Sequence, residues 1–178
     1  AMLCAYMTAR NASPSLRILH LLSITSLAIP GIVLGLAYVL FFKASFIYGT
    51  FAIIILVNIV HFFASPYLMI YNSLRKLPPE LEAVGATLGI GKVRLLRDVI
   101  IPQTAGTLCE MFAYFFINSM MTISAISFLT NYKTEMFSLM LPQFDASQTS
   151  LALPAIVAII ILFANLIMKG IIGLLKSK

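Results

Sequence analysis

Long apolar runs constrain this chain more than any other feature of its sequence. Residues 18–42 contain no Asp, Glu, Lys or Arg, and a helix of about 20 apolar residues is long enough to cross the hydrocarbon core of a bilayer. Further apolar runs cover about residues 46–71, 104–129 and 151–168, with Glu110 as the one acid among them. We therefore predict an all-α polytopic membrane protein with four spans at these positions.

The composition supports a single transmembrane domain that covers residues 1–178. Hydrophobic residues make up 61% of the chain, charged residues make up 10%, and the mean hydropathy is +1.01, which lies outside the range of soluble globular proteins. Residues 1–9 are apolar but too short to cross a bilayer, so we interpret them as the end of a span that begins before residue 1. Cys4 and Cys109 lie in apolar sequence without a CxxC pattern, which supports neither a disulfide nor a metal site.

Basic residues are distributed unequally between the two sides of the four predicted spans. One side carries ten Lys and Arg residues, whereas the other carries only Lys43 and Lys133. Because Lys and Arg are enriched in cytoplasmic loops, we expect the segment 72–102 and the C-terminus to face the cytoplasm. This bias also accounts for the net charge of +6, so nucleic-acid binding is not expected. The ten residues are Arg10, Arg17, Arg75, Lys76, Lys92, Arg94, Arg97, Lys169, Lys176 and Lys178.

The segment 72–102 is polar and lies between two apolar runs. It holds five of the 12 Lys and Arg residues and three of the six acids. A Pro-Pro pair followed by Glu80 and Glu82 is typical of a helix start, because proline fits the first turn and acids there complement the helix dipole. Small residues on part of this helix favour close packing against a neighbouring helix. Gly89 predicts the end of the helix, as glycine commonly does.

A second short helix is expected over residues 92–100. Its apolar face is predicted to contain Val93, Leu96 and Ile100, with the basic residues largely off that face. Pro102 is expected to push the residue before it out of helical conformations and so to end this helix. The segment therefore predicts a helix-turn-helix at the membrane surface, with an exposed turn that is basic and rich in glycine.

The glycines of this turn do not form a nucleotide-binding motif. A Walker A loop requires glycine where Ala86 stands and Ser or Thr where Val93 stands. Arg94 occupies the place of the third glycine of a dinucleotide-binding pattern. We therefore expect this chain to bind no cofactor itself, ATP included.

The segment instead resembles the cytoplasmic signature of ABC-importer permeases of the binding-protein-dependent type, which reads E-A-A, three residues, Gly, nine residues and I-x-L-P. Gly89 takes the place of the glycine, and nine residues then lead to residues 99–102, V-I-I-P, in place of I-x-L-P. Residues 83–85, A-V-G, replace E-A-A, so the acid of the motif is absent there, while Glu82 directly precedes them. The resemblance covers residues 18–178 and implies a MetI-like permease core.

In that family the segment is a coupling helix that docks in a groove on a separate ATPase subunit. Closure of two ATPases around ATP moves the permease halves between inward- and outward-facing states. The resemblance implies a permease subunit of the inner membrane that is not itself an enzyme. Its partners would be an ATPase dimer, a second permease half, an extracytoplasmic substrate-binding protein and membrane lipid. The residues implied in coupling are Glu82, Ala83, Gly85, Gly89, Ile90, Gly91, Lys92 and Arg94.

Polar side chains inside the predicted spans are candidates for function because such groups are costly in a bilayer. The richest run either lines a translocation path or binds neighbouring helices, as Ser, Thr and Asn do in membranes. Glu110 is expected either to contact substrate or to pair with another helix, and Asn58 is expected to serve packing or a dimer interface. The candidate path residues are Asn118, Ser119, Thr122 and Ser124.

Residues 119–129, followed by Lys133, Thr134 and Glu135, are similar to the corresponding stretch of permeases that import ferric iron or 2-aminoethylphosphonate. This likeness implies one of those two substrates. Permeases for polyamines, sulfate and molybdate share the fold, so the substrate stays open at this point, as does the choice between a homodimer and a heterodimer.

Three other interpretations of the chain stay open beside the permease. The basic hairpin suits an amphipathic element that binds anionic lipid headgroups, or a scaffold that only recruits a cytoplasmic partner. An intramembrane enzyme would need paired ionisable groups at membrane depth, and the spans offer only Glu110 and the isolated His61. No metal site is expected from these residues.

Overall fold

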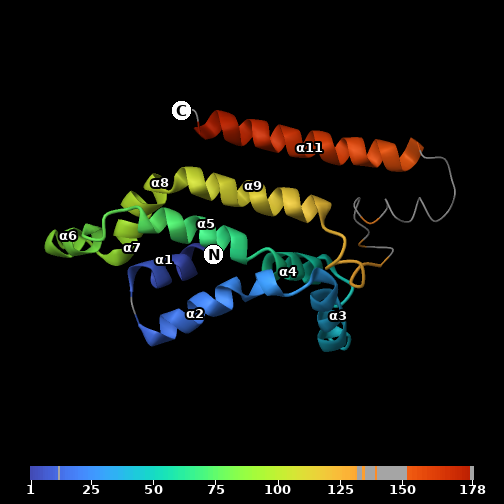
Figure 1. Ribbon diagram of the computed structural model, residues 1–178, viewed down its shortest axis with the longest axis horizontal. Coiled ribbons are helices and arrows are strands. Elements are labelled where there is room, and N and C mark those ends of the chain that lie inside the picture. The colour runs from blue at the N-terminus through green and yellow to red at the C-terminus, as the bar shows by residue number, and fades with distance from the viewer. Residues whose placement is uncertain (12, 132–133, 135–138, 140–151, 177–178) are drawn as a thin grey trace. The chain divides into compact units, whose positions relative to one another are not determined.

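The computed structural model of the chain (Figure 1) describes residues 1–11, 13–131, 134, 139 and 152–176. All regular elements within these residues are helical, which confirms the all-α fold class. The helices form two compact units, each made of two stretches of chain. Unit 1 comprises Ala1–Ser26 and Phe63–Phe112, and unit 2 comprises Leu27–Phe62 and Ala113–Lys178. The single domain over residues 1–178 stays a prediction.

Unit 1 is built on the packing of α1, α2 and α5, which lie side by side (Figure 1). Tyr67, Ile70 and Leu74 of α5 are fully buried, and Ala5 of α1 lies in the same core. The helices of unit 1 are α1 (Met2–Arg10), α2 (Pro14–Ile24), α5 (Ala64–Arg75), α6 (Leu81–Thr87), α7 (Lys92–Leu95), the π-helical turn η2 (Leu96–Ile100) and α8 (Ile101–Gln103).

Unit 2 has its own core, formed where α4 meets the segment that follows α9. Ile53 and Val57 of α4 are fully buried together with Ala125 and Ile126, and residues of α3 pack around them. The helix α9 runs from unit 1 into unit 2, as does the short 3₁₀ turn η1. The helices of this part are η1 (Thr25–Ala28), α3 (Gly31–Phe42), α4 (Phe51–His61), α9 (Ala105–Met121) and α11 (Ala152–Lys176).

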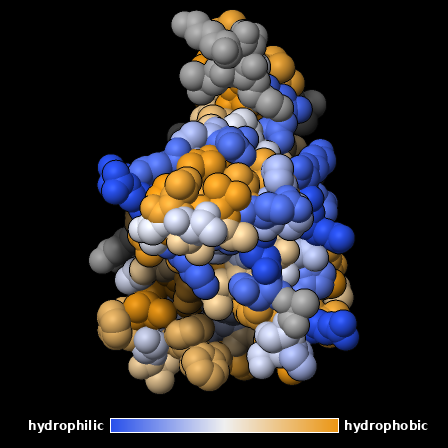
Figure 2. Space-filling model, turned by 90° about the vertical axis from the view of Figure 1, so that its left-hand side faces the viewer, coloured by the Kyte–Doolittle hydropathy of each residue, from blue (hydrophilic) through white to orange (hydrophobic). Residues whose placement is uncertain are grey.

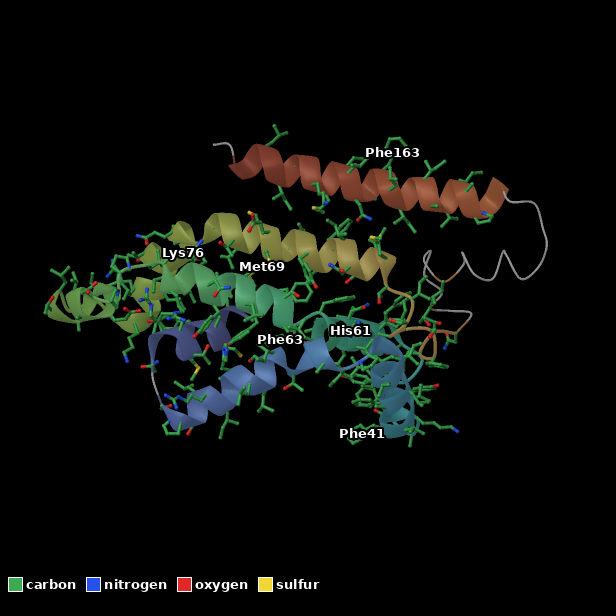
Figure 3. All side chains as sticks on the ribbon, viewed as in Figure 1. Phe41, His61, Phe63, Met69, Lys76 and Phe163 are labelled. Atoms are coloured by element: carbon green, nitrogen blue, oxygen red, sulfur yellow. The ribbon has the colours of Figure 1, made fainter. Side chains whose placement is uncertain are left out.

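One helix among the described residues is long and apolar enough to cross a membrane without a break. It covers Pro154–Leu174 within α11, and only 6% of its most apolar window is buried; its Phe163 side chain points outward (Figure 3). Up to four spans result if each of three bent helix pairs counts as one span. The pairs are Pro14–Ala28 with Gly31–Phe42, Phe51–His61 with Ala64–Arg75, and Lys92–Gln103 with Ala105–Met121.

The observed helices differ in their limits from the spans expected at about 46–71, 104–129 and 151–168. In the region expected as the span 46–71, the helix begins only at Phe51, after a series of turns. In the region expected as the span 151–168, α11 continues beyond Met168 to Lys176. The helix α9 ends at Met121, where a segment rich in Ser and Thr begins. Such side chains compete with helical hydrogen bonds by binding nearby backbone, and Ser127 Oγ does donate to the Ser124 carbonyl at 3.3 Å.

The break between α4 and α5 is compensated by a side chain. The backbone N–H of Ala64, at the start of α5, donates to Ser26 Oγ at 3.2 Å. Ser and Thr side chains commonly satisfy backbone groups that are freed where a membrane helix is interrupted. Ser26 therefore stabilises a helix start that would otherwise leave a donor unpaired away from water.

Pro102 does not end the second helix of the polar segment, so that expectation is wrong. Ile101 has helical dihedrals (φ −61°, ψ −48°), and the chain passes through the π-helical turn Leu96–Ile100 into α8. The N–H of Ile101 donates to the Leu96 carbonyl, five residues back. Thr104 then satisfies the Ile100 carbonyl through both its N–H at 3.0 Å and its Oγ1 at 2.8 Å. The wider turn accommodates a proline that an α-helical turn would exclude.

Two glycines on α3 allow a close approach of the chain in unit 2. A Cβ atom at Gly35 would meet the backbone carbonyl of Ala125, and one at Gly31 would meet the Ser124 side chain and, at 3.2 Å, Nε2 of His61. Small residues at helix contacts permit such an approach in membrane proteins. The segment after α9 can therefore lie directly against α3, because Gly31 and Gly35 have no side chains that would push it away.

We predict that Gly35→Ala destabilises unit 2, because the backbone of Ala125 has to move away from the added methyl group. The expected cost is about 1–3 kcal/mol, as for other overpacked sites, or about 2–4 °C in Tm for each kcal/mol in a chain of this size. Gly173→Ala on α11 is the matched control, because nothing lies within 4 Å of its added Cβ. Thermal unfolding of the purified full-length protein checks this, and equal Tm values for the two variants would contradict it.

Candidate functional site

The polar segment forms a helical hairpin, in which α6, a turn over residues 88–91 and α7 follow one another. We refer to residues 81–95 as the polar hairpin. Gly89 has a φ of +69°, its N–H donates to the Ala86 carbonyl at 3.1 Å, and the N–H of Ile90 donates to the Gly85 carbonyl at 2.8 Å. These two bonds and the left-handed residue form a Schellman motif, the usual way in which glycine ends a helix.

The inner side of the polar hairpin is anchored in the core of unit 1. Gly85 is buried, and a Cβ there would lie 3.3 Å from Leu95 Cδ2, so glycine lets α6 and α7 pack closely. Leu95 is 5% exposed and Ile100 is fully buried, in one cluster with Ile70 and Leu74 of α5. The hairpin is therefore packed into the same core as α5.

An ion pair also fixes the polar hairpin to α1. Arg10 Nε lies 3.1 Å from Glu82 Oε1, and the two side chains are only 8% and 22% exposed. Neither of these two atoms has a hydrogen-bond partner, so the attraction is that of two charges in a poorly solvated place. Arg10 Nη1 donates to the carbonyls of Leu77 and Pro78 at 3.4 and 3.3 Å, just before α6.

The outer side of the polar hairpin exposes an apolar patch. Val84, Leu88 and Val93 are 52%, 68% and 81% exposed, and we call them the apolar patch. Figure 2 looks onto the side where α6 lies and shows apolar atoms bordered by hydrophilic side chains. Large apolar side chains exposed beside basic groups are typical of a surface that binds another protein.

The eight predicted coupling residues divide between these two sides. Glu82, Gly85 and Ile90 face inward, to the Arg10 ion pair, to Leu95 and to the unit 1 core respectively. The other five are exposed on the outer side: Ala83, Gly89, Gly91, Lys92 and Arg94. Whether any of the eight contacts a partner stays a prediction.

The apolar patch was not predicted: Val93 was expected to share an apolar face with Leu96 and Ile100, and it is 81% exposed, whereas Leu95 is buried together with Ile100. Leu95 takes that place, since Leu95 and Ile100 are separated by the five-residue spacing of the π-helical turn. Val84 and Leu88 are four residues apart, so they share a face of α6. That spacing could have identified them, because Glu82 and Gly85 belong to the opposite, packed side.

The candidate path residues lie near the end of α9 and in the segment after it. Asn118 Nδ2 donates to the Tyr114 carbonyl of its own helix at 2.7 Å. Thr122 is buried, Ser119 is half-buried, and Ser124 packs against Gly31. Packing within unit 2 thus accounts for part of this polar run, and its role in a path stays a prediction.

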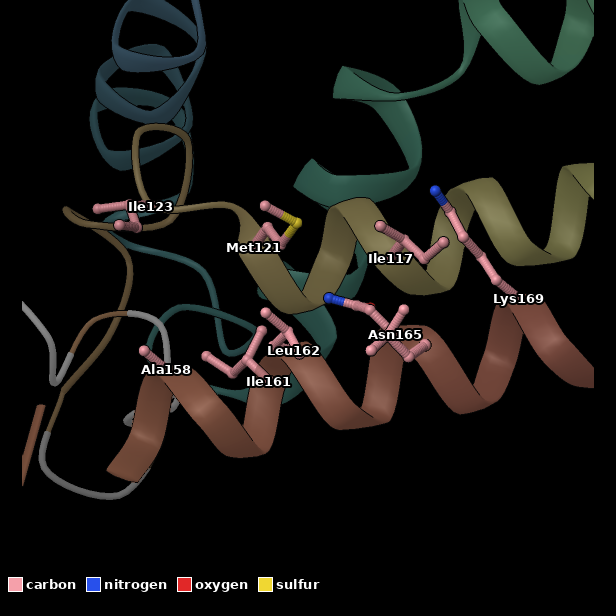
Figure 4. Close-up of a pocket in the computed structure, with 9 residues that line it drawn as sticks. Ile117, Met121, Ile123, Ala158, Ile161, Leu162, Asn165 and Lys169 are labelled. Carbon is pink, nitrogen blue, oxygen red and sulfur yellow. The ribbon is translucent and has the colours of Figure 1, made fainter. Parts of the chain in front are cut away.

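A cavity of about 530 Å³ lies beside this run, between α9 and α11 (Figure 4). Its described lining is mostly apolar, with Ile117 and Met121 on α9 opposite Ile161 on α11, and the polar lining residues are Asn165 and Lys169 of α11. None of the four candidate path residues is among the described residues that line it. In the described part of the chain, no three His, Cys, Asp or Glu side chains gather so that they could hold a metal ion.

Comparisons with known proteins agree with this architecture. The family described as binding-protein-dependent transport system inner membrane component matches residues 1–178. The chain is 26% identical to the sulfate transport system permease protein CysT of Salmonella typhimurium, over 99% of this chain and 69% of that protein. It is 29% identical to the Fe(3+)-transport system permease protein FbpB 2 of Haemophilus influenzae, over 58% of this chain and 21% of that protein.

We predict that Gly89→Ala opens the hairpin turn, because a left-handed conformation costs a residue with a Cβ about 1–2 kcal/mol. The added methyl group itself has space, since nothing lies within 4 Å of it. Hydrogen exchange of the Ile90 amide should accelerate about 5–30-fold. Gly91→Ala is the matched control, because Gly91 has a φ of −63° and an equally open Cβ position. Acceleration in both variants alike would refute the conformational explanation.

We also predict that Glu82→Gln destabilises the protein by about 1–3 kcal/mol, because it leaves the enclosed Arg10 guanidinium without its counter-charge. Glu80→Gln, next to the same helix start but exposed, should change stability by less than about 0.5 kcal/mol. Chemical unfolding of the two variants measures the difference. If Glu82→Gln is as stable as Glu80→Gln, the ion pair does not hold α6 to α1.

Proposed function

Because the chain belongs to the family of binding-protein-dependent transport system inner membrane components, we propose that its polar hairpin couples a separate ATPase to the opening and closing of a substrate path. The chain is then a permease subunit of an ABC importer, and ATP binds to and is hydrolysed on the partner. The observation that carries this proposal is the two-sided hairpin: an exposed apolar patch lies outside, and Leu95 is buried inside, followed by the buried Ile100 of η2.

The apolar patch supports docking of the hairpin into a groove of the ATPase. Burying a Val or Leu side chain contributes about 1.5–3 kcal/mol, so Leu88 and Val93 are suited to be the apolar anchors of the contact. Lys92 and Arg94, both exposed beside the patch, would meet acidic side chains at the rim. Gly89 and Gly91 present no side chains and let the partner approach the backbone of the turn closely.

The inner side of the hairpin supports transmission of movement to the membrane helices. Leu95 and Ile100 are packed on α5, and Glu82 is paired with Arg10 at the end of α1. A displacement of the hairpin by closure of the ATPases would therefore move α1 and α5 rather than deform the loop. This is what alternating access requires of a coupling element.

The same proposal includes the arrangement in the inner membrane. The hairpin and the C-terminus face the cytoplasm, as the distribution of Lys and Arg favours. Two ATPases, a second permease half and an extracytoplasmic binding protein complete the transporter. The bent helix pairs supply the further spans of a multi-pass arrangement.

We propose ferric iron or 2-aminoethylphosphonate as the substrate. The relative named as an Fe(3+) permease supports the first of these. The relative named as a sulfate permease covers more of the chain, and sulfate is therefore the substrate to test beside them. Uptake measured with each of the three in cells that lack and carry the gene separates these possibilities.

The proposed function is tested by Leu88→Asp in the full-length permease, purified with the ATPase encoded beside its gene. A carboxylate in the docking groove removes an apolar contact of about 1.5–3 kcal/mol and buries a charge, so co-purification should weaken by at least about 10-fold. Substrate-stimulated ATP hydrolysis should fall with it, while Tm stays unchanged. Asn72→Asp, exposed at the end of α5, carries the same added charge outside the hairpin and should have no effect.

Two results would count against coupling. If Leu88→Asp keeps both ATPase binding and stimulated hydrolysis, the hairpin is not the contact. If ATPase binding is lost but uptake continues at the wild-type rate, the chain is a scaffold that recruits the ATPase without transmitting its movement.

A further inference from the structure

Unit 1 contains a second cavity, between α1, α2 and α5, which the proposed coupling does not use. Its volume is about 540 Å³, and we call it the basic cavity. Three guanidinium groups line it, one from each helix or its end: Arg10, Arg17 and Arg75. His20, Tyr71 and Ser13 are the main other polar residues of its lining.

The charges of the basic cavity are not balanced by acids within it. None of its described lining residues is Asp or Glu, and the ion pair with Glu82 engages Arg10 from outside the lining. Like charges gathered in a partly enclosed place repel one another, and an anion between them converts this repulsion into attraction. The cavity is therefore suited to a negatively charged ligand.

Arg10 gives a second and independent indication of a ligand. Its side chain is only 8% exposed, yet its Nη2 atom is buried without a hydrogen-bond partner. Buried polar groups are nearly always hydrogen-bonded in folded proteins, and a guanidinium in particular offers five donors. The Arg10 guanidinium therefore keeps an unpaired donor next to the basic cavity, where its charge attracts an anion.

The wall of the basic cavity is held in place by a buried polar cluster. The hydroxyl of Tyr67, a fully buried residue, lies 2.6 Å from His20 Nδ1 and 2.8 Å from Thr8 Oγ1. The rings of His20 and Tyr71 are 4.9 Å apart, and the Arg75 guanidinium lies 5.8 Å from the centre of the Tyr71 ring. These contacts link side chains of α1, α2 and α5, so the cavity is formed before a ligand enters.

We propose that the basic cavity binds a phosphate group, presented by an anionic phospholipid. Arginine suits this ligand because its planar fork matches two phosphate oxygens at once, and basic pockets between membrane helices bind lipid headgroups. Arg17 of α2 and Arg75 of α5, both exposed, bind the phosphate from two helices, and the positive charge of Arg10 beside them adds to the attraction.

The surroundings favour a lipid over a free anion. The cavity is lined by Leu21 of α2, which is 60% exposed, and the neighbouring Ile18 and Leu22 are 60% and 65% exposed. This apolar side of α2 offers a surface along which acyl chains can lie. A volume of about 540 Å³ also exceeds what a phosphate group alone fills, since a water molecule takes up about 30 Å³ in the liquid.

Native mass spectrometry of the full-length permease, titrated with dioleoylphosphatidylglycerol, tests this site. Each basic residue near a lipid surface contributes about 1 kcal/mol, so Arg17→Ala and Arg75→Ala should each weaken binding about five-fold. Both residues are exposed, so their replacement should leave the fold and the Tm unchanged. Lys76→Ala is the matched control, because Lys76 is next to Arg75 at the end of α5 (Figure 3) but is not among the lining residues.

The source of the phosphate is decided by two further titrations. In the wild type, phosphatidylcholine should bind more weakly than phosphatidylglycerol, because its choline cation offsets the phosphate charge. In the Arg17→Ala and Arg75→Ala variants this difference between the two lipids should disappear. If inorganic phosphate binds in an Arg17-dependent way and the lipids show no such dependence, the ligand is a soluble phosphate. The proposal is overturned if neither lipid nor inorganic phosphate binding changes in the Arg17→Ala and Arg75→Ala variants. That outcome would leave the coupling proposal intact, because Leu88 lies outside the basic cavity.

Discussion

Burial of Leu95 and Ile100 is the constraint on which the arrangement of unit 1 depends. A stretch as short as residues 72–102 cannot form an independent core of its own. It keeps a fixed position because these two side chains enter the cluster built by Ile70 and Leu74 of α5. The ion pair between Arg10 and Glu82 then fixes the start of α6 to a second helix. A polar hairpin is thereby held rigidly to helices that are otherwise apolar.

The two sides of the hairpin carry different kinds of interaction. The inner side uses burial, one ion pair and a glycine contact, all of which specify a position. The outer side leaves Leu88 and Val93 without cover in the isolated chain, which lowers solubility unless a partner binds there. A coupling element that receives force at one surface and passes it on at another requires such a division.

Much of the architecture could be predicted from the sequence, because apolar runs and glycines have strong local effects. The helical class, the start of α6 near Glu80 and the reversal at Gly89 follow from such local rules. The breaks inside the apolar runs were less accessible, since they depend on compensation from distant residues such as Ser26 at the start of α5. Propensity alone does not report a hydrogen bond between residues so far apart in the chain.

The candidate site shows the same limit more sharply. The apolar face of residues 92–100 was predicted with the 3.6-residue period of an α-helix, and the π-helical turn changes that period. Glu82 is engaged by Arg10, far away in the sequence, so its inward position could not be read from the motif. The basic cavity likewise brings together three arginines whose sequence positions carry no common pattern.

The π-helical turn between Leu95 and Ile100 also determines which changes of sequence this region can accept. Such a turn is equivalent to one residue inserted into an α-helix, and one residue corresponds to a rotation of about 100°. Loss of a single residue here would rotate α6 and α7 about the helix axis and carry Leu88 to a different side of the molecule. Exchange of one apolar residue for another would leave the geometry in place. The position of the hairpin therefore depends more on the chain length between Gly89 and Pro102 than on the identity of most residues within it.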